Sequence, residues 1–430
     1  MKLYIKYFFP FLIVLLTLVS VNQWTSLPVG NQFTTWTLCF ILLIGFIIQK
    51  KFFYDKVNDP NLKFVYAYLL WIFICFLRGV FIAEHYWDYK NLIGSSLGLF
   101  VIYAIFVFTN PTVLQIVMHS WLKYALPLFF IFIFFIDRGA SGFYLMPLSL
   151  LLLFYPSLNI KWKIIVIGLF LLVIIIGLDV RTNVIKYVIS FVFSFLLSFR
   201  KILNSKLFRL TYVFFLVIPF ILLFLGISNI FNIFKIEDYV KGNYETTSVI
   251  GGKQEVDDLK ADSRTFLYEE VIGSAIKNDY ILVGRSLARG NDSAAFGAHF
   301  AEELRTFRYE RIENEVSVLN VFTWTGVIGL ILYFLIFYKA CHLALYKSNN
   351  SYIKIIGFYV AFRWMIAWLE DLNRFDINNL FLWITVAMCF SESFRKMTDK
   401  EFRIWFQGLF EKKKPLTRKV RNNLIFSKNL

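Results

Sequence analysis

Four cations lie near the same end of the apolar segments that dominate this chain: Arg78, Arg181, Lys186 and Arg363. A charge at this depth in a membrane is costly unless it faces a cavity, a partner or an anionic ligand. For a single residue, snorkelling or internal pairing is the alternative, for example Arg181 with Asp179 or Arg363 with Glu370. Because four cations share one end, we expect them to form an anion-binding site.

The polar segment 231–315 contains a second set of arginines: Arg264, Arg285, Arg289, Arg305, Arg308 and Arg311. Arginine suits phosphate or pyrophosphate because its planar guanidinium group donates two hydrogen bonds at once. The last three alternate with glutamates, which is typical of a solvated helix face with salt bridges, and we leave them outside the site. Arg264 lies at a predicted helix start, where backbone N–H groups also favour an anion. We therefore predict that Arg264, Arg285 and Arg289 contact an anionic substrate.

Two carboxylates, Glu313 and Glu315, lie where the tenth apolar run begins. The helix macrodipole stabilises a carboxylate near a helix start, which is a purely structural explanation. The same position keeps the group ionised, as a general base needs to be. The residues alone leave both roles open.

Cysteine and histidine offer no pattern for a metal site or a disulfide framework. Cys39, Cys75, Cys341 and Cys389 fall within or at the edge of apolar runs, and no C-x-x-C or H-x-x-x-H spacing occurs. We therefore expect chemistry without a metal or another cofactor.

Repeated apolar runs must position these side chains. The chain has 430 residues, of which 58% are hydrophobic and only 17% are charged, too few to cover a soluble protein of this size. Runs of about 15 to 22 residues predict an all-α polytopic membrane protein with about 12 transmembrane helices. The predicted spans are 4–22, 33–49, 63–83, 90–109, 118–136, 142–157, 162–179, 182–199, 208–230, 316–338, 351–370 and 376–394.

Lysine and arginine are concentrated in alternate connections between the spans: Lys50, Lys51, Lys56, Lys161, Lys163, Arg200, Lys201, Lys206, Lys339 and Lys347. The positive-inside rule then predicts that both termini are on the inner side of the membrane. Segment 231–315 has a net charge of −5 against +21 for the remainder, and it is predicted to face outward. The basic composition thus indicates topology and gives no evidence of nucleic-acid binding.

The predicted spans divide the chain into four regions: transmembrane helices at 1–230, an outer loop at 231–315, transmembrane helices at 316–396 and a basic inner tail at 397–430. One loop helix is predicted to start at Asp262 or Ser263 and to run to about Lys277, and a second is predicted from Ser293 to Arg308. An apolar stripe around Phe402 predicts an amphipathic helix on the inner membrane surface.

Three segments carry a resemblance to the O-antigen ligase and polymerase superfamily: VRTNVIKYVISFVFSF from Val180, SRTFLYEEVIGSAIKNDYILVGRS from Ser263 and ENEVSVLNVFTWTGVIGLILYF from Glu313. The first resembles a family segment in which an arginine opens a span, here Arg181. The second resembles a loop pattern with an arginine and a turn glycine, here Arg264 and Gly284. The third resembles H-N-x-x-L-x-x-x-x-E-x-G-x-x-G and matches it at Leu319, Gly326 and Gly329.

This chain departs from the family pattern at several positions. Glu315 stands where the family has histidine, Val316 where it has asparagine and Trp324 where it has glutamate. The proline before the turn is absent, and Ser286 replaces the second glycine. Glutamate can accept a proton as histidine does, so the resemblance makes Glu315 the candidate base.

The resemblance implies a bacterial inner-membrane glycosyltransferase with a periplasmic loop and cytoplasmic termini. Its donor would be a glycan on undecaprenyl pyrophosphate, and its reaction a metal-independent displacement with inversion. Arg181 and Arg264 would hold the pyrophosphate and Glu315 would act as base. Further substrate-binding residues are expected at Arg78, Lys186, Arg285, Arg289 and Arg363.

The absent histidine favours an O-antigen or capsule polymerase, whose acceptor is another lipid-linked repeat unit, over a ligase that transfers glycan to the lipid A core or a protein. Expected partners are the lipid-linked glycan, the bilayer and a chain-length regulator protein, and no nucleic acid. A lipid-linked oligosaccharide flippase would also carry cations in its spans, although no repeat of one half in the other is visible. A scaffold or sensor with a ligand-binding loop would give no reason for such cations.

Overall fold

A computed structural model describes residues 8–53, 59–177, 180–199, 206–235, 245–250, 253–258 and 264–410 of the chain. The α-helices are α1 (Phe9–Val19), α2 (Gln32–Phe53), α3 (Lys63–Ile82), α4 (Tyr86–Phe100), α5 (Ala104–Phe108), α6 (Pro111–Ser120), α7 (Leu126–Phe132), α8 (Ser141–Tyr144), α9 (Leu148–Leu153), α10 (Ile160–Ile176), α11 (Arg181–Phe195), α13 (Lys206–Ile227), α14 (Thr265–Lys277), α15 (Gly297–Glu303), α16 (Ser317–Tyr346), α17 (Ser351–Ile366), α18 (Ile377–Phe390), α19 (Glu392–Lys396) and α20 (Asp399–Gln407). Short 3₁₀ turns include η7 (Tyr155–Ser157) and η8 (Leu196–Ser198). Two antiparallel pairs of strands complete the described elements: β1 (Glu245–Ile250) with β2 (Lys253–Asp258), and β3 (Asn291–Asp292) with β4 (Glu310–Arg311).

The architecture is that of an all-α membrane protein. Among the described residues, six helical segments are long and apolar enough to cross a membrane: Gln32–Lys50, Pro60–Ile82, Tyr86–Phe108, Pro111–Phe132, Phe208–Ile227 and Ser317–Tyr346. Two shorter apolar helices are Phe9–Trp24 and Ile377–Phe390. Helices α10, α11 and α17 have 17, 15 and 16 residues, close to the shortest length that spans a bilayer. The count of about 12 spans stays a prediction.

The apolar run 142–157 does not form the single helix that its hydropathy predicts. It folds into α8, α9 and the turn η7, with Pro147 at the break. Proline cannot donate a backbone hydrogen bond, so the helix is interrupted there. Every residue of α9 is buried, so this run is apolar because it lies in the protein core.

Helices α16, α17 and α18 form the centre of the bundle. They pack on one another, and α3 and α13 pack against them. All residues of α18 are buried, which is expected of a helix surrounded on every side. Phe337 of α16 lies with its ring centroid 5.4 Å from that of Trp364 of α17 and 5.8 Å from that of Trp383 of α18.

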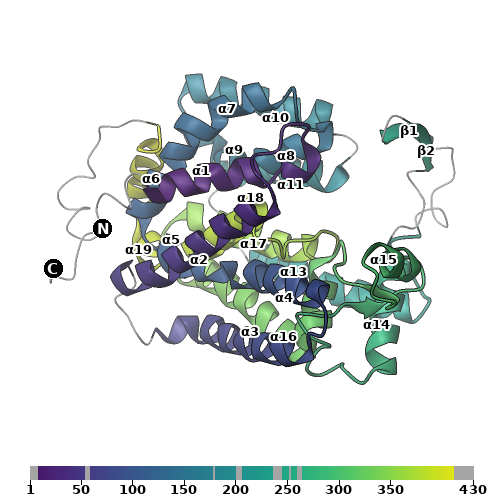
Figure 1. Ribbon diagram of the computed structural model, residues 1–430. Coiled ribbons are helices and arrows are strands. Elements are labelled where there is room, and N and C mark those ends of the chain that lie inside the picture. The colour runs from purple at the N-terminus through teal and green to yellow at the C-terminus, as the bar shows by residue number, and fades with distance from the viewer. Residues whose placement is uncertain are drawn as a thin grey trace.

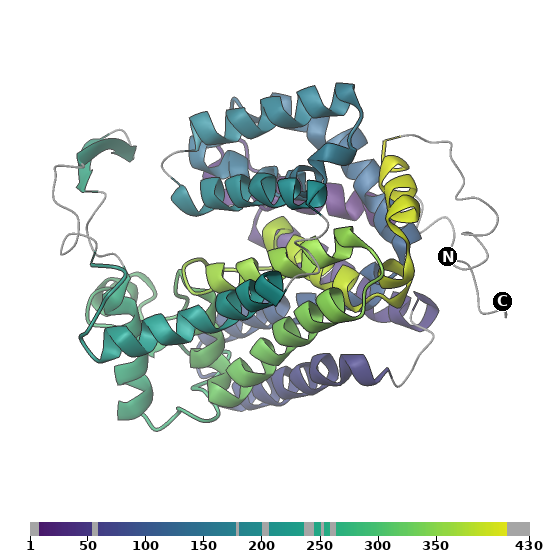
Figure 2. The ribbon, with the colours of Figure 1, turned by 180° about the vertical axis from the view of Figure 1, so that it is seen from behind.

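Helices α14 and α15 lie at one end of the bundle, which we call the loop end, and α19 lies at the other (Figure 1). The view from behind shows the same arrangement (Figure 2). Helix α14 is held by Tyr268, whose hydroxyl donates to the Trp368 carbonyl at 2.7 Å. That carbonyl belongs to the connection 367–376 between α17 and α18, so α14 packs directly on the membrane helices.

The connection 367–376 also wraps around the first turn of α16. The backbone N–H of Ser317 donates to the Glu370 carbonyl at 3.0 Å, and the Asn373 side chain donates to the Ser317 carbonyl at 2.9 Å. The Ser317 hydroxyl donates to the Glu370 carbonyl at 2.9 Å and accepts from the backbone of Leu372. These bonds satisfy backbone groups that a helix start leaves unpaired.

Two glycines allow the loop to enter α16 at a kink. Gly326 has φ +69° inside α16, and Gly284 of the loop has φ +74°. A Cβ atom on Gly284 would lie 2.5 Å from the Gly326 nitrogen, so both the left-handed backbone and the close approach require glycine. The Val327 N–H donates to the Ile281 carbonyl at 2.9 Å, which replaces a helical bond lost at the kink.

The two helices predicted in the loop agree with the structure to different extents. Helix α14 ends at Lys277 as predicted, whereas its predicted N-caps, Asp262 and Ser263, lie outside the described residues. The predicted helix 293–308 is wrong, because only Gly297–Glu303 is helical. The chain then turns back and pairs β4 with β3.

The apolar stripe of α20 packs on the protein and not on the membrane surface. Phe402 and Trp405 are fully buried. The Phe402 ring lies 5.2 Å from that of Phe154, and the Trp405 indole donates to the Pro111 carbonyl at 2.9 Å. The helix was predicted correctly and its partner was not, because a hydrophobic stripe does not distinguish lipid from a neighbouring helix.

Candidate functional site

Glu315 lies between two arginines at the loop end, just before α16. Its Oε2 lies 2.6 Å from Nη1 of Arg264, the residue before α14, and its Oε1 lies 3.4 Å from Nη2 of Arg311. Arg264 and Glu315 are 51 residues apart in sequence. The Glu315 side chain is 59% exposed and that of Arg264 is 25% exposed, whereas Arg311 is buried. We call these three residues the Glu315 cluster.

The Glu315 cluster combines one carboxylate with two guanidinium groups. Arg311 stacks over the Phe296 ring at 4.6 Å, which fixes the direction of its planar fork. Burial lowers the pKa of Arg311, while Glu315 and Glu270 oppose that change, and arginine stays protonated in any case. The cluster therefore offers an exposed proton acceptor next to cations that can bind a phosphate.

A second cluster of carboxylates lies beside the first turn of α16. Arg374 Nη2 lies 3.3 Å from Glu313 Oε2, and its Nε lies 3.1 Å from Asp371 Oδ2. Burial raises the pKa of Asp371 to about 8, and the charge of Glu313 adds to the effect. Asp371 can therefore exchange a proton near neutral pH, and the sequence analysis did not select it. The feature of the sequence that could have indicated Asp371 is the charged stretch between the last two apolar runs.

A third cluster, of charged residues, lies inside the helix bundle near the loop end. Lys186 of α11 binds Glu370 at 2.6 Å, although the two are 184 residues apart. Arg363 of α17 donates to the Asn378 side chain at 3.0 Å and to the Tyr359 hydroxyl at 3.2 Å. Within the described residues, Arg363 Nε and Glu370 Oε2 are buried without a hydrogen-bond partner.

The buried cluster connects to the surface through the backbone. Glu370 accepts from Ser317 through its carbonyl and from Lys186 through its carboxylate, and Ser317 follows Glu315 by two residues. A series of polar groups therefore links the Glu315 cluster at the loop end to Arg363 in the core of the bundle. Among the predicted site residues, the structure brings together Arg264 with Glu315, and it places Lys186 and Arg363 around Glu370 and Asn378.

The other predicted arginines have different partners. Arg285 binds Asp292 at 2.7 Å and Glu310 at 2.9 Å, and Arg289 also binds Glu310. Arg285 therefore ties β3 to β4, and Arg289 adds further bonds to Glu310 of β4. The role of both arginines as substrate ligands stays a prediction. Arg78 donates to the Gly284 carbonyl at 2.8 Å and so holds the turn at the kink of α16.

Arg181 is the first residue of α11, with an exposed side chain. It lies five residues before Lys186, which is about 7.5 Å along the helix axis. The interpretation of Arg305, Arg308 and Arg311 as one solvated helix face is wrong, because all three follow the end of α15. Arg308 binds Glu84 and Asp88 at the start of α4.

A groove of about 640 Å³ runs along α14 at the loop end, a volume typical of a ligand site. Its lining carries four carboxylates and two cations: Glu269, Glu270, Asp292, Glu310, Lys277 and Arg308. Tyr309, also in the lining, is 65% exposed. The excess of carboxylates disfavours a pyrophosphate, whereas carboxylates and an aromatic face suit the hydroxyl groups and C–H faces of a sugar. The groove begins about 7.5 Å along α14 from Arg264.

Within the described part of the chain, no group of three or more His, Cys, Asp or Glu side chains is arranged to hold a metal ion. The four cysteines are free and buried. No family model, curated protein or solved structure matches this chain.

Proposed function

We propose that this protein is a bacterial inner-membrane glycosyltransferase that polymerises undecaprenyl-pyrophosphate-linked oligosaccharide repeat units at the periplasmic face. The observation that carries the proposal is the 2.6 Å contact between Arg264 and Glu315. It joins, at one end of a membrane bundle, the residue types needed to hold a pyrophosphate and to accept a proton.

The reaction is a single displacement. The donor pyrophosphate binds Arg264 and Arg311 and takes the place of the Glu315 carboxylate on them, which frees Glu315 to face the acceptor. The acceptor sugar hydroxyl attacks the anomeric carbon of the donor, and its proton passes to Glu315. A new glycosidic C–O bond forms while the C–O bond to pyrophosphate breaks, and the arginines stabilise the charge that develops on the leaving group.

Two further observations support the proposal. Gly284 and Gly326, the motif glycines of the family resemblance, meet at the kink of α16, where each requires glycine. The groove along α14 is suited to the sugars of a repeat unit and leads away from the arginines that would hold pyrophosphate.

The decisive experiment uses the full chain in lipid nanodiscs with a purified lipid-linked repeat unit. A ladder of products, each longer by one repeat unit, is the expected result. Transfer only to a lipid A core or to an added protein would replace polymerase by ligase. Movement of the donor between leaflets of proteoliposomes without any new glycosidic bond would replace the enzyme by a flippase.

The proposal includes about 12 spans, cytoplasmic termini and a periplasmic loop. Single cysteines at Lys277 and at Asn349, in a variant whose native cysteines are replaced by alanine, test this topology. Both positions are exposed, at the loop end and between α16 and α17 respectively. A membrane-impermeant thiol reagent applied to outer-membrane-permeabilised cells should label Lys277→Cys and spare Asn349→Cys. The reverse pattern would place the Glu315 cluster in the cytoplasm and contradict a periplasmic reaction.

A further inference from the structure

The segment 304–309 lies between α15 and β4 at the loop end and exposes two aromatic side chains. Phe307 is 90% exposed and Tyr309 is 65% exposed. Phe307 and Arg305 have φ values of +55° and +50°, a left-handed backbone that is uncommon for residues with bulky side chains. Such strain is concentrated at functional sites, where the surrounding structure imposes it. The chain therefore holds a phenyl ring away from the protein at a conformational cost.

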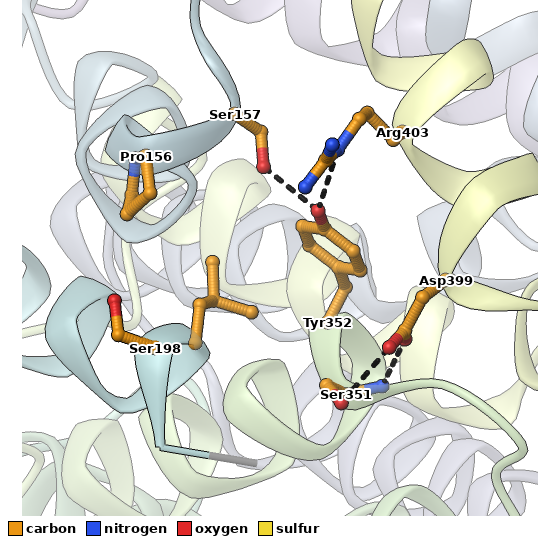
Figure 3. A pocket seen from close by; sticks show the side chains of 8 residues that line it. Pro156, Ser157, Ser198, Ser351, Tyr352, Asp399 and Arg403 are labelled. Carbon is orange, nitrogen blue, oxygen red and sulfur yellow. Dashed lines mark hydrogen bonds between the residues drawn. The ribbon is translucent and has the colours of Figure 1, made fainter.

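Side chains at the opposite end of the bundle have partners within the protein. Figure 3 shows them around a cavity of about 140 Å³. The Tyr352 hydroxyl bonds Ser157 at 2.7 Å and accepts from Arg403 Nε at 3.4 Å. These bonds join η7, α17 and α20. Phe307, in contrast, has most of its surface in contact with whatever surrounds the protein.

Arg308, the next residue, fixes the segment 304–309 beside the connection between α3 and α4. Its Nη1 lies 2.9 Å from Asp88 Oδ2, and its Nη2 binds Glu84. Asp88 is itself held in place, because it accepts from the backbone N–H groups of Glu84 and His85 at 3.0 and 3.2 Å. The segment cannot leave this connection without breaking charged hydrogen bonds, which are the strong ones in proteins.

The connection between α3 and α4 lies where a membrane surface would be. Pro60–Ile82 and Tyr86–Phe108 are both long and apolar enough to cross a membrane, and only residues 83–85 join them. Phe81 is 87% exposed and Tyr86 is 70% exposed, as expected where aromatic side chains gather between hydrocarbon and water. Arg308 therefore holds Phe307 close to the membrane surface.

Charged groups near Phe307 do not decide what it contacts. Arg305 is exposed and Glu84 is 65% exposed, and on α15 His299 lies 3.6 Å from Glu303. Because groups of both signs surround the ring, attraction to a charged surface is not the basis of the contact. The favourable change is the removal of apolar surface from water, which is proportional to the area buried.

We propose that Phe307 inserts into the lipid bilayer beside α3 and α4 and anchors the loop to the membrane surface. Its partner is the boundary between head groups and acyl chains, because a phenyl ring has no polar atom to bond a head group. Removal of the ring from water offsets the conformational cost of the left-handed backbone. The anchor does not depend on the proposed function. It would also hold the groove along α14, whose lining includes Arg308 and Tyr309, beside the bilayer that carries a lipid-linked donor.

The test is the depth of a nitroxide attached to Phe307→Cys, in the full chain in nanodiscs of phosphatidylcholine, a lipid without net charge. The four native cysteines are buried, so wild type taken through the same labelling gives the background. Electron paramagnetic resonance then compares collisions with oxygen, which concentrates in lipid, and with a nickel chelate, which stays in water. The oxygen-to-nickel ratio at position 307 should match that at Phe81→Cys. It should be several-fold higher than the ratio at Glu302→Cys, an exposed position on α15.

A nickel chelate that reaches position 307 as readily as position 302 would overturn the proposal. Low collision rates with both reagents would also overturn it and identify a protein surface as the partner, and spin–spin broadening between labels would identify that surface as a second copy of this chain. Arg308→Gln, added to Phe307→Cys, should lower the ratio because the segment is released. The matched control is Arg305→Gln, which removes an exposed arginine of the same segment and should leave the ratio unchanged. Equal ratios in these two double variants would contradict the role of Arg308.

Discussion

Replacing Glu315 by glutamine tests the catalytic role of the Glu315 cluster. The side chain keeps its shape and can still bond Arg264, but it can no longer take up a proton. Loss of a general base lowers the rate about 10²- to 10⁴-fold, or about 2.7 to 5.5 kcal/mol in activation free energy. The ion pair with Arg264 lies mostly in solvent, because Glu315 is 59% exposed. Such pairs contribute about 0 to 1 kcal/mol to stability, so activity should fall while the unfolding midpoint moves by at most a few degrees.

The assay is single-turnover extension of a lipid-linked repeat unit in nanodiscs, with donor binding measured on the same preparations. Glu315→Gln should bind donor nearly as well as wild type and extend it at least 100-fold more slowly. Glu313→Gln is the matched control, since Glu313 also pairs with an arginine and lies two residues away. It should stay within a few-fold of wild type. Extension by Glu315→Gln at a similar rate would refute its role as base and move attention to Asp371.

Three further predictions concern the proposed pyrophosphate site, the groove along α14 and Asp371. Arg181→Ala and Arg264→Ala should each abolish polymer formation in cells at normal protein levels. Lysine at either position should restore little activity because it lacks the planar guanidinium group. Full-length polymer from both alanine variants would contradict a pyrophosphate site at these residues. A Cβ atom on Gly273, in the groove along α14, meets nothing within 4 Å. Gly273→Ala should therefore stay active and stabilise the helix by about 0.5–1 kcal/mol, whereas Gly273→Trp should fill the groove and raise KM for the repeat unit. Equal kinetics of the two variants would show that the groove is not used. Burial raises the pKa of Asp371 to about 8 from its ordinary 3.8. Between these pH values the folded protein binds more protons than the unfolded chain, so the free energy of unfolding should fall as pH rises from about 5 to about 8. Asp371→Asn should flatten this pH dependence in thermal unfolding, and an unchanged slope would refute the assignment.

The family resemblance selects residues that the structure brings into contact with one another. It aligned Gly284 and Gly326 with motif glycines, and the structure explains both by one close contact at the kink of α16. It also selected Arg264 and Glu315, which lie together. Residue type predicts Arg285 and Arg289 as substrate ligands, and this stays a prediction; their guanidinium groups lie against Asp292 and Glu310. Residue type alone cannot show which carboxylate an arginine will meet.

Local patterns predicted the elements whose structure depends on neighbours in sequence. Helix α14 ends where its pattern ends, and α20 forms where its apolar stripe lies. The prediction failed at 293–308, because Arg308 leaves the helix to bind Glu84 and Asp88 more than 200 residues away. The prediction also failed at 142–157. This segment is interrupted, but it is buried in the protein core and is therefore as apolar as a membrane span.

The sequence by itself determined that this is a helical membrane protein and which polar residues lie near the ends of its helices, because hydrophobic period and length are local properties. Only the tertiary structure decided which charges meet. Lys186 finds Glu370 across 184 residues, and Arg264 finds Glu315 across 51. The first pairing depends on how α11 packs on α17, and the second on how α14 packs on α16. Side-chain partners are therefore set by long-range packing, which no local pattern encodes.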